Sequence, residues 1–222
     1  MIYLFHSDAG NATLSLEGDS FKHMIKARRH VPGDELQLRQ KDDPFLSTYR
    51  IDSVGKKDAV LSLVKSEPIK LTQDKQLHLG WSLIDPKSIE KVLPSLCELG
   101  VTKITLLYAR RSQHQFKIDI DRLERIILNS MQQSGRFDML QIQSGLTLET
   151  FVKQNPDALV LDFCETPLKK DDSFQTVILG PEGGFSEEEK ELLEDLTTRK
   201  LQTPMVLRSE TAAIAISSMM LL

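Results

Sequence analysis

The segment VILGPEGGFSEEE, residues 177–189, joins a short apolar run to a turn rich in glycine. The run ends at Gly180, and the next four positions hold one proline and two more glycines. Ser186 follows, with Glu189 three residues later, which is the spacing of a capping box at the start of a helix. The segment is therefore predicted to form a buried strand, a tight glycine loop and a helix.

A loop of this kind can bind a ligand through its main chain. Glycine lets a ligand approach the backbone closely, and the first N–H groups of a helix have no partner within the helix. A phosphate group is the obvious ligand for such a loop. Here, however, no GK[ST] sequence follows, and glutamates at 182 and 187–189 would repel a polyanion. The surroundings favour a neutral or cationic ligand.

The composition is that of an ordinary globular protein. With 222 residues, 40% of them hydrophobic and 27% charged, the chain can bury a sizeable core in one or two domains. It has no apolar run of membrane-spanning length, and its first residues, MIYLF, lack the basic start of a signal peptide. Cys97 and Cys164 lie far apart, and the five histidines form no ligand spacing. We therefore expect two buried thiols, a reducing cytoplasm, no metal site and no membrane contact.

Positive charge gathers in two places, although the net charge is −4. Residues 1–70 carry 11 Lys/Arg and 10 Asp/Glu, whereas residues 71–222 carry 17 and 22. The first basic cluster is KHMIKARRH at 22–30, and the second lies within 110–125. The residues of the two clusters that could contact a nucleic acid are Lys26, Arg28, Arg29, Arg110 and Arg111. Each cluster either contacts phosphates or is a solvated face with ordinary salt partners.

Residues 1–70 have the pattern of short strands separated by turns. Strands are predicted at 35–39, 48–51 and 59–64. One or two helical turns are predicted within 19–29. This arrangement is typical of a small β-barrel-like domain, and the polar segment 66–70, which contains a proline, is the expected linker.

From residue 77 onward, strands and helices alternate. Strands are predicted at 77–83, 101–108, 158–163, 177–179 and 202–207. Helices are predicted at 87–99, 121–134, 186–196 and 210–222. Apolar strands that alternate with helices predict an α/β fold with a mostly parallel sheet covered on both faces. Ligands bind such sheets beyond the carboxyl ends of the strands, where residues 180–184 and 208–211 fall.

The two segments at these strand ends resemble a known family. The sequence GPEGGF at 180–185, followed by LRSETA at 207–212, resembles the paired C-terminal motif of the SPOUT methyltransferases. More narrowly, the chain resembles the family that methylates N3 of a uridine in 16S ribosomal RNA. Further matches are ELGV at 98–101, RS at 111–112, QSGR at 133–136 and, in a PUA-like N-terminal domain, His23, Arg28, Gly33 and Asp34.

The resemblance implies a PUA-like β-barrel domain at 1–70 that binds RNA. It implies a SPOUT domain at 71–222 with a C-terminal trefoil knot. The implied cofactor is S-adenosyl-L-methionine, and the implied partners are the 16S rRNA of the small ribosomal subunit and a second copy of the chain. The implied cofactor-binding residues are Phe163, Leu179, Gly180, Pro181, Glu182, Gly183, Gly184, Leu207, Ser209, Thr211 and Ala212. The implied RNA-binding residues are Lys26, Arg28, Arg29, Arg110, Arg111, Gln133 and Arg136.

Methylation at N3 of a uridine removes the imide proton as the methyl group arrives. The reaction needs in-line positioning and a group that accepts this proton or eases its loss. Arg136 and Arg208 are candidates to stabilise the developing negative charge, and Glu210 is the candidate proton acceptor. Structural roles compete with these assignments: Arg136 could be the dipole partner of a helix end, and Glu210 could cap the last helix or pair with Arg208.

Two other functions fit the same sequence. A methyltransferase of the same fold could act on another RNA base or on a ribose 2′-hydroxyl, and its product would differ, since N3 methylation blocks the Watson–Crick edge of the base. A non-catalytic rRNA-binding maturation factor would need no cofactor. The intact glycine loop argues against that factor.

Overall fold

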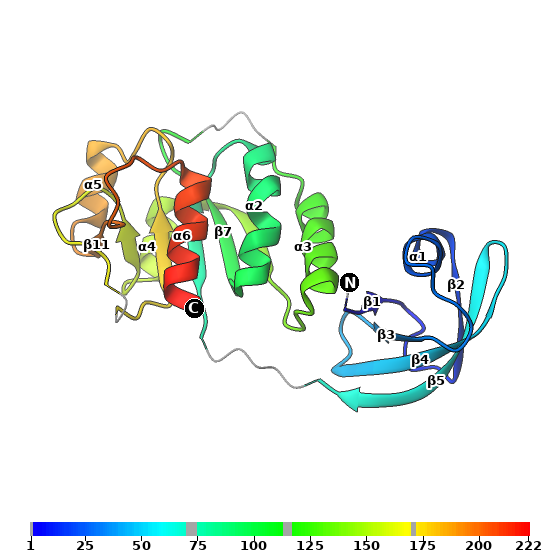
Figure 1. Cartoon of the computed structure of the whole chain (residues 1–222). Helices are drawn as coiled ribbons and strands as arrows, with labels where there is room; N and C mark the ends of the chain where they lie inside the picture. Colours follow the sequence, from blue (N-terminus) through cyan, green and yellow to red (C-terminus); the bar gives the residue numbers. More distant parts are fainter. Residues whose placement is uncertain (1, 70–74, 113–116, 170–171) are drawn as a thin grey trace. The chain divides into compact units, whose positions relative to one another are not determined.

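The computed structural model describes residues 2–69, 75–112, 117–169 and 172–222. The chain divides into two compact units (Figure 1). The N-terminal unit comprises Met1–Thr72 and Gln132–Phe137, and the C-terminal unit comprises Gln73–Met131 and Asp138–Leu222. The boundary predicted between residues 70 and 71 lies outside the described residues. The N-terminal unit is thus assembled from two separate stretches of the chain.

A five-stranded sheet forms the N-terminal unit, in the order β1-β3-β4-β5-β2. The strands are β1 (Leu4–Phe5), β2 (Thr13–Glu17), β3 (Glu35–Arg39), β4 (Phe45–Val54) and β5 (Asp58–Pro68). The short helices α1 (Gly18–Phe21) and η1 (Lys22–Lys26) follow β2. The three predicted strands are confirmed, but the expected linker is partly wrong. Residues 66–68 extend β5, where Ser66 pairs with Ser47 and Pro68 with Phe45, and residue 70 lies outside the described residues.

A buried arginine attaches the second stretch to the first. Arg39 is only 6% exposed. Its guanidinium donates to the Phe137 carbonyl oxygen at 2.9 Å and lies between 5.4 and 5.8 Å from the ring centres of Tyr3, Phe5 and Phe137. The Tyr3 hydroxyl donates to the carbonyl oxygen of Arg136. Hydrogen bonds and cation–π contacts therefore fix residues 136 and 137 within this unit.

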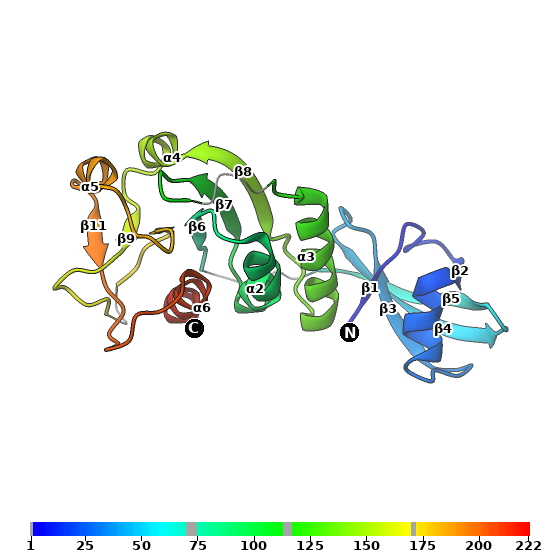
Figure 2. The same cartoon turned by 90° about the horizontal axis from the view of Figure 1, so that it is seen from above.

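The C-terminal unit is built on a six-stranded parallel sheet, in the order β11-β9-β10-β6-β7-β8. The strands are β6 (His78–Ser82), β7 (Lys103–Tyr108), β8 (Gln141–Thr147), β9 (Leu159–Leu161), β10 (Thr176–Leu179) and β11 (Thr197–Arg199). The helices are α2 (Pro86–Leu99), α3 (Ile120–Ser134), α4 (Leu148–Gln154), α5 (Glu187–Leu193) and α6 (Ser209–Leu221). Figure 2 shows α2 and α6 on one face of the sheet and α4 and α5 on the other. The predicted α/β fold with a mostly parallel sheet is confirmed.

One predicted strand is wrong. Residues 202–207 form a loop, and the last strand is instead β11, which pairs with β9. Pro204 has no N–H to donate to a sheet, and the side chains of Met205 and Val206 are 68% and 80% exposed, which does not suit a buried strand. The elements β8 and α4 were not predicted from the sequence. The signal at β8 is weak, because it is an edge strand with mostly exposed residues and a glycine, Gly145.

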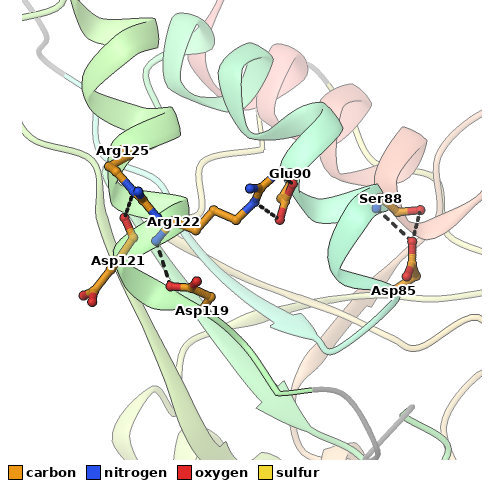
Figure 3. A network of polar contacts seen from close by, with 7 residues as sticks. All are labelled: Asp85, Ser88, Glu90, Asp119, Asp121, Arg122 and Arg125. Carbon is orange, nitrogen blue, oxygen red and sulfur yellow. Dashed lines mark hydrogen bonds and ion pairs between the residues drawn. The ribbon is translucent and has the colours of Figure 1, made fainter.

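Helices α2 and α3 are joined by a bidentate ion pair (Figure 3). The Arg122 guanidinium donates to both carboxylate oxygens of Glu90, at 2.6 and 2.8 Å, and holds the pKa of Glu90 below its usual range. Asp85 caps α2 by accepting from the Ser88 N–H, and Asp119 accepts from the N–H of Arg122. In the second basic cluster, Arg122 therefore has an ordinary salt partner.

Three further observations concern only the residues described above. None of their helices is long and apolar enough to cross a membrane. They contain no group of three His, Cys, Asp or Glu side chains placed to hold a metal ion. Cys97 is buried as predicted, but Cys164 is only partly buried, and its thiol donates to the Thr166 carbonyl oxygen at 3.2 Å.

His78 begins β6, where it is partly buried opposite Lys103 of β7. Its Nε2 lies 2.8 Å from the Thr105 hydroxyl, and its ring meets the Phe151 ring edge-on at 5.1 Å. Burial, with a smaller effect of the Lys103 charge, lowers the pKa of His78 from its ordinary value of 6.5 to about 4. The imidazole is therefore neutral in the folded protein at neutral pH.

This shift predicts a pH dependence of stability. Between about pH 4 and 6.5 the unfolded chain binds a proton at His78 that the folded chain does not. The free energy of unfolding should therefore fall as the pH decreases through this window, by at most about 3 kcal/mol from this group. Urea unfolding of the wild type and His78→Gln at several pH values measures the contribution as the difference between the two curves. Parallel curves would contradict the prediction.

Candidate active site

A cavity lies at the carboxyl ends of β9 and β10. Nine of the predicted cofactor-binding residues line it: Phe163, Leu179, Gly180, Pro181, Glu182, Gly184, Leu207, Ser209 and Ala212. Gly183 and Thr211 are not in its lining. Residues that sequence reasoning missed complete the wall: Leu161, Asp162, Phe185, Lys200, Leu201, Thr203, Met205 and Val206. The missed residues lie mainly in the loop 200–206, whose only sequence signal was Pro204 inside the predicted strand.

Two glycines of the turn after β10 have a steric reason to be glycine. A Cβ on Gly180 would lie 3.1 Å from the ring of Phe185, which is tighter than most packed contacts. Gly184 has φ +69°, in the left-handed region, and its N–H donates to the Pro181 carbonyl oxygen at 2.9 Å. No side chain fills the space beside Gly184. The turn thus exposes main chain to the cavity.

Glu189 joins this turn to the loop after β7. Its side chain is buried, 7% exposed. One carboxylate oxygen accepts from the Ser186 N–H at 2.8 Å, while the Ser186 hydroxyl accepts from the Glu189 N–H, so the predicted capping box is confirmed. The other oxygen accepts from the Arg110 N–H at 2.7 Å. A single carboxylate therefore positions two loops, at the ends of β7 and β10, the two strands on either side of β6.

The side chains of Arg110 and Arg111 reinforce this junction. Arg110 makes an exposed ion pair with Glu188 at 2.8 Å. Arg111 donates to the carbonyl oxygen of Gly183 at 2.7 Å and lies against the position where a Gly183 side chain would be. Both arginines were predicted to bind RNA; in this structure the Arg111 side chain holds the glycine turn and the Arg110 side chain pairs with the first turn of α5.

Ser209 connects the cavity to the centre of the sheet. Its hydroxyl accepts from the indole N–H of Trp81 at 2.8 Å and donates to the carbonyl oxygen of Gly180 at 3.2 Å. Trp81 is fully buried in β6. The start of α6 is therefore fixed against the end of β10, and Ala212, one turn later, lines the cavity.

The three candidate catalytic residues fall in different surroundings. Arg208 is the exposed N-cap residue of α6, and Glu210 lies in the first turn of that helix. Oε2 of Glu210 is buried and has no hydrogen-bond partner among the described residues. Arg136 is buried in the N-terminal unit. None of the three lines the cavity, although Arg208 and Glu210 flank Ser209, which does.

The remaining predicted RNA-binding residues lie in the N-terminal unit. Lys26, Arg28, Arg29 and Gln133 are all exposed. The ammonium of Lys26 lies 5.2 Å from the ring centre of the buried Phe21, so its stem is held against the sheet. Because they are exposed, these side chains are accessible to a phosphate backbone.

The chemistry of the cavity wall is mixed. Leucines supply apolar surface, the glycine turn supplies main-chain groups, and the ionisable groups of the lining are Asp162, Glu182 and Lys200. Acids outnumber the single lysine. Such a wall suits a ligand with a flat apolar ring and a positive centre.

Comparisons with known proteins identify the class of protein to which the chain belongs. A family model described as the RNA methyltransferase domain matches residues 72–221. A structure of a methyltransferase from Legionella pneumophila in complex with S-adenosylmethionine is 27% identical, with a TM-score of 0.78 over 98% of this chain and 94% of that one. A ribosomal RNA small subunit methyltransferase E from Neisseria gonorrhoeae bound to the same molecule, 20% identical over 98% and 95%, shares the fold with a TM-score of 0.78. The fold is that of an RNA methyltransferase.

Curated relatives narrow the class to a family. The chain is 37% identical to ribosomal RNA small subunit methyltransferase E of Helicobacter pylori strain J99, over 98% of both chains. It is 29% identical to the protein of the same name from Rickettsia conorii, over 96% of this chain and 91% of that one. The chain belongs to the ribosomal RNA small subunit methyltransferase E family.

The hydrogen bonds of Glu189 predict that a conservative substitution at this position lowers the stability of the protein. Glu189→Gln keeps the shape but places an NH₂ group against one of two buried N–H donors. The free energy of unfolding should fall by about 1–3 kcal/mol, measured by urea unfolding. Glu187→Gln is the matched control, because it removes the same charge from the same helical turn at an exposed site, where Glu187 forms an ion pair with the exposed Lys190. Equal losses in both variants would contradict the role of Glu189.

Proposed function

We propose that the chain transfers a methyl group from S-adenosylmethionine to N3 of a uridine in the 16S rRNA of the small ribosomal subunit, in the cytoplasm. The observation that carries the proposal is the cavity formed by the glycine turn and the start of α6, the helix in which Oε2 of Glu210 is buried with no hydrogen-bond partner among the described residues. Membership of the rRNA methyltransferase family supports the reaction type. The match of the chain to the uridine-N3 family at 98–101, 111–112 and 133–136 supports the target atom.

The residues present fit S-adenosylmethionine. The absent side chain at Gly184 leaves room at the turn, and main-chain groups of 180–184 are available to polar parts of the cofactor. Leu161, Leu179 and Leu207 offer an apolar surface to its adenine. Glu182 and Asp162 suit its positive charges. When bound, the cofactor supplies an electrophilic methyl group on a sulfonium.

Within the proposal, the chain itself handles the proton and the charge. Oε2 of Glu210 is an acceptor that no described residue satisfies, so no described donor competes for it, and Glu210 stays the candidate to take the N3 proton. Arg208 precedes it, and its exposed guanidinium would stabilise the negative charge that develops on the uracil oxygens. Arg136, buried in the N-terminal unit, stays a prediction as a second charge-stabilising residue.

RNA binding is assigned to exposed groups of both units. Lys26, Arg28, Arg29 and Gln133 would contact the RNA from the N-terminal unit. Arg110 and Arg111 would do so from the C-terminal unit, because a guanidinium has several N–H donors, of which Arg110 gives one to Glu188 and Arg111 gives one to the Gly183 carbonyl oxygen. Arg136 is buried and stays a prediction as an RNA-binding residue.

We also infer that the chain forms a homodimer through α6. The apolar side chains of Met219 and Leu222 lie at the C-terminal end of this largely apolar helix. Their exposed fractions are 37% and 77%. Apolar side chains of this kind are commonly covered by a partner. Sedimentation equilibrium should give twice the mass of one chain, and Met219→Lys should lower it. A monomer at micromolar concentration would contradict the inference.

The experiment that tests the proposed function separates cofactor binding from chemistry. Calorimetric titration with S-adenosylmethionine should show micromolar binding by the wild type and none by Gly184→Trp, whose indole would occupy the cavity. Gly145→Trp is the control, since Gly145 also has a positive φ in open space but lies in β8. No heat for the wild type at millimolar cofactor would contradict the methyltransferase reaction and favour a non-catalytic rRNA-binding role.

The target is then identified from the product. Unmodified small subunits and protein-free 16S rRNA are each incubated with enzyme and cofactor, and their nucleosides are analysed by mass spectrometry. 3-Methyluridine is expected, and a different methylated base or a 2′-O-methyl nucleoside would favour the alternative target. Glu210→Gln should bind the cofactor normally and react about 100-fold more slowly. An unchanged rate would exclude Glu210 as the proton acceptor.

A further inference from the structure

The N-terminal unit contains a second cavity. None of its lining residues comes from the elements around the glycine turn. Its volume is about 450 Å³, within the roughly 300–1,000 Å³ of small-ligand sites. The residues that matter for its chemistry are Met24, Arg28, His30, Gln37, Thr48 and Lys65. Six of the nine lining residues carry polar or charged groups, so the cavity is not a packing defect in the apolar core.

Three neighbouring strands supply a row of polar side chains to this cavity. Gln37 of β3 is directly opposite Thr48 of β4, and Thr48 is directly opposite Lys65 of β5. Directly opposed residues of antiparallel strands present their side chains on the same face. An amide, a hydroxyl and an ammonium therefore stand side by side, and a register shift in β4 follows immediately after Thr48. Bulges of this kind often lie next to functional sites.

Two further lining residues, Arg28 and His30, come from the segment after η1. Arg29 has φ 60°, a left-handed conformation that is uncommon for a residue with a side chain, and it separates Arg28 from His30. Nδ1 of His30 lies 2.9 Å from a carboxylate oxygen of Asp34, which also accepts from the Val31 N–H at 3.1 Å. The imidazole is thus held in one orientation at the cavity.

The charges of the lining favour an anion at the rim. Arg28 and Lys65 are positive and exposed, and Glu35 is the single acid of the lining. The ammonium of Lys65 makes an ion pair with Glu67 at 2.8 Å, but both side chains are more than half exposed. Exposed pairs contribute little to stability, so this one can be exchanged for a phosphate.

We propose that this cavity is a nucleotide subsite that takes one unpaired nucleotide of the RNA, other than the nucleotide that is methylated. Gln37 and Thr48 offer both donors and acceptors to a base edge, Met24 and the fixed His30 ring offer surface to its face, and Arg28 and Lys65 offer charge to its phosphate. The inference rests on the proposed function only in taking RNA as the ligand. On this inference, the sheet of the N-terminal unit helps to select the RNA sequence and does not only attract the phosphate backbone of the RNA.

The test measures RNA binding without cofactor or catalysis. Full-length protein is titrated with fluorescein-labelled single-stranded hexanucleotides of U, A, C or G, and fluorescence anisotropy gives each affinity. Lys65→Gln should weaken all four about equally, by several-fold, because it removes a phosphate contact. Gln37→Leu should weaken the preferred sequence about tenfold and the others less, because it removes contacts to a base edge. Lys56→Gln, which lies in the turn before β5 and outside the lining, is the charge control.

Several outcomes would overturn the proposal. If Gln37→Leu leaves the order of the four affinities unchanged, the cavity does not read a base. If inorganic phosphate displaces every oligonucleotide equally well from the wild type and from Gln37→Leu, the cavity is an anion site only. Thermal unfolding of each variant verifies that it folds. Failure of the proposed function would be visible separately, as loss of cofactor binding or of product with these affinities intact.

Discussion

The buried carboxylate of Glu189 is the constraint on which the cavity depends. Removing a charge from water is costly unless hydrogen bonds replace the lost solvation, and here two main-chain N–H groups from different loops do so. Its place in the first turn of α5 adds the favourable field of the helix dipole. The glycine turn is consequently fixed before any ligand arrives, which spares the ligand the entropy cost of ordering it.

The two sides of the cavity are held in different ways. The turn after β10 is joined to the loop after β7 by Glu189 and Arg111, and to β6 through Ser209. The facing loop is held by local contacts, such as the bond from the Met205 N–H to the Thr203 hydroxyl, and its apolar side chains are exposed. A rigid side sets the position of a ligand, while a less constrained side can close over it.

How much the sequence predicted depended on whether the signal was local. The capping box and the strand before it follow from short-range rules, and the structure has them. The loop 202–207 was mistaken for a strand, because its apolar residues face the cavity and not a core. The partners of Arg39 and Glu189 were not predictable, since sequence spacing does not give contacts between residues about 80 to 100 positions apart.

The attachment of Gln132–Phe137 to the N-terminal sheet has a consequence for biosynthesis. A domain usually folds as soon as its last residue leaves the ribosome. Here the partners of Arg39 and Tyr3 are translated about 65 residues after Thr72, so roughly 3 to 13 seconds pass at ordinary elongation rates. During that interval the nascent sheet exposes the aromatic surface that later encloses Arg39. The chain is therefore most open to chaperones, and to aggregation, in mid-translation.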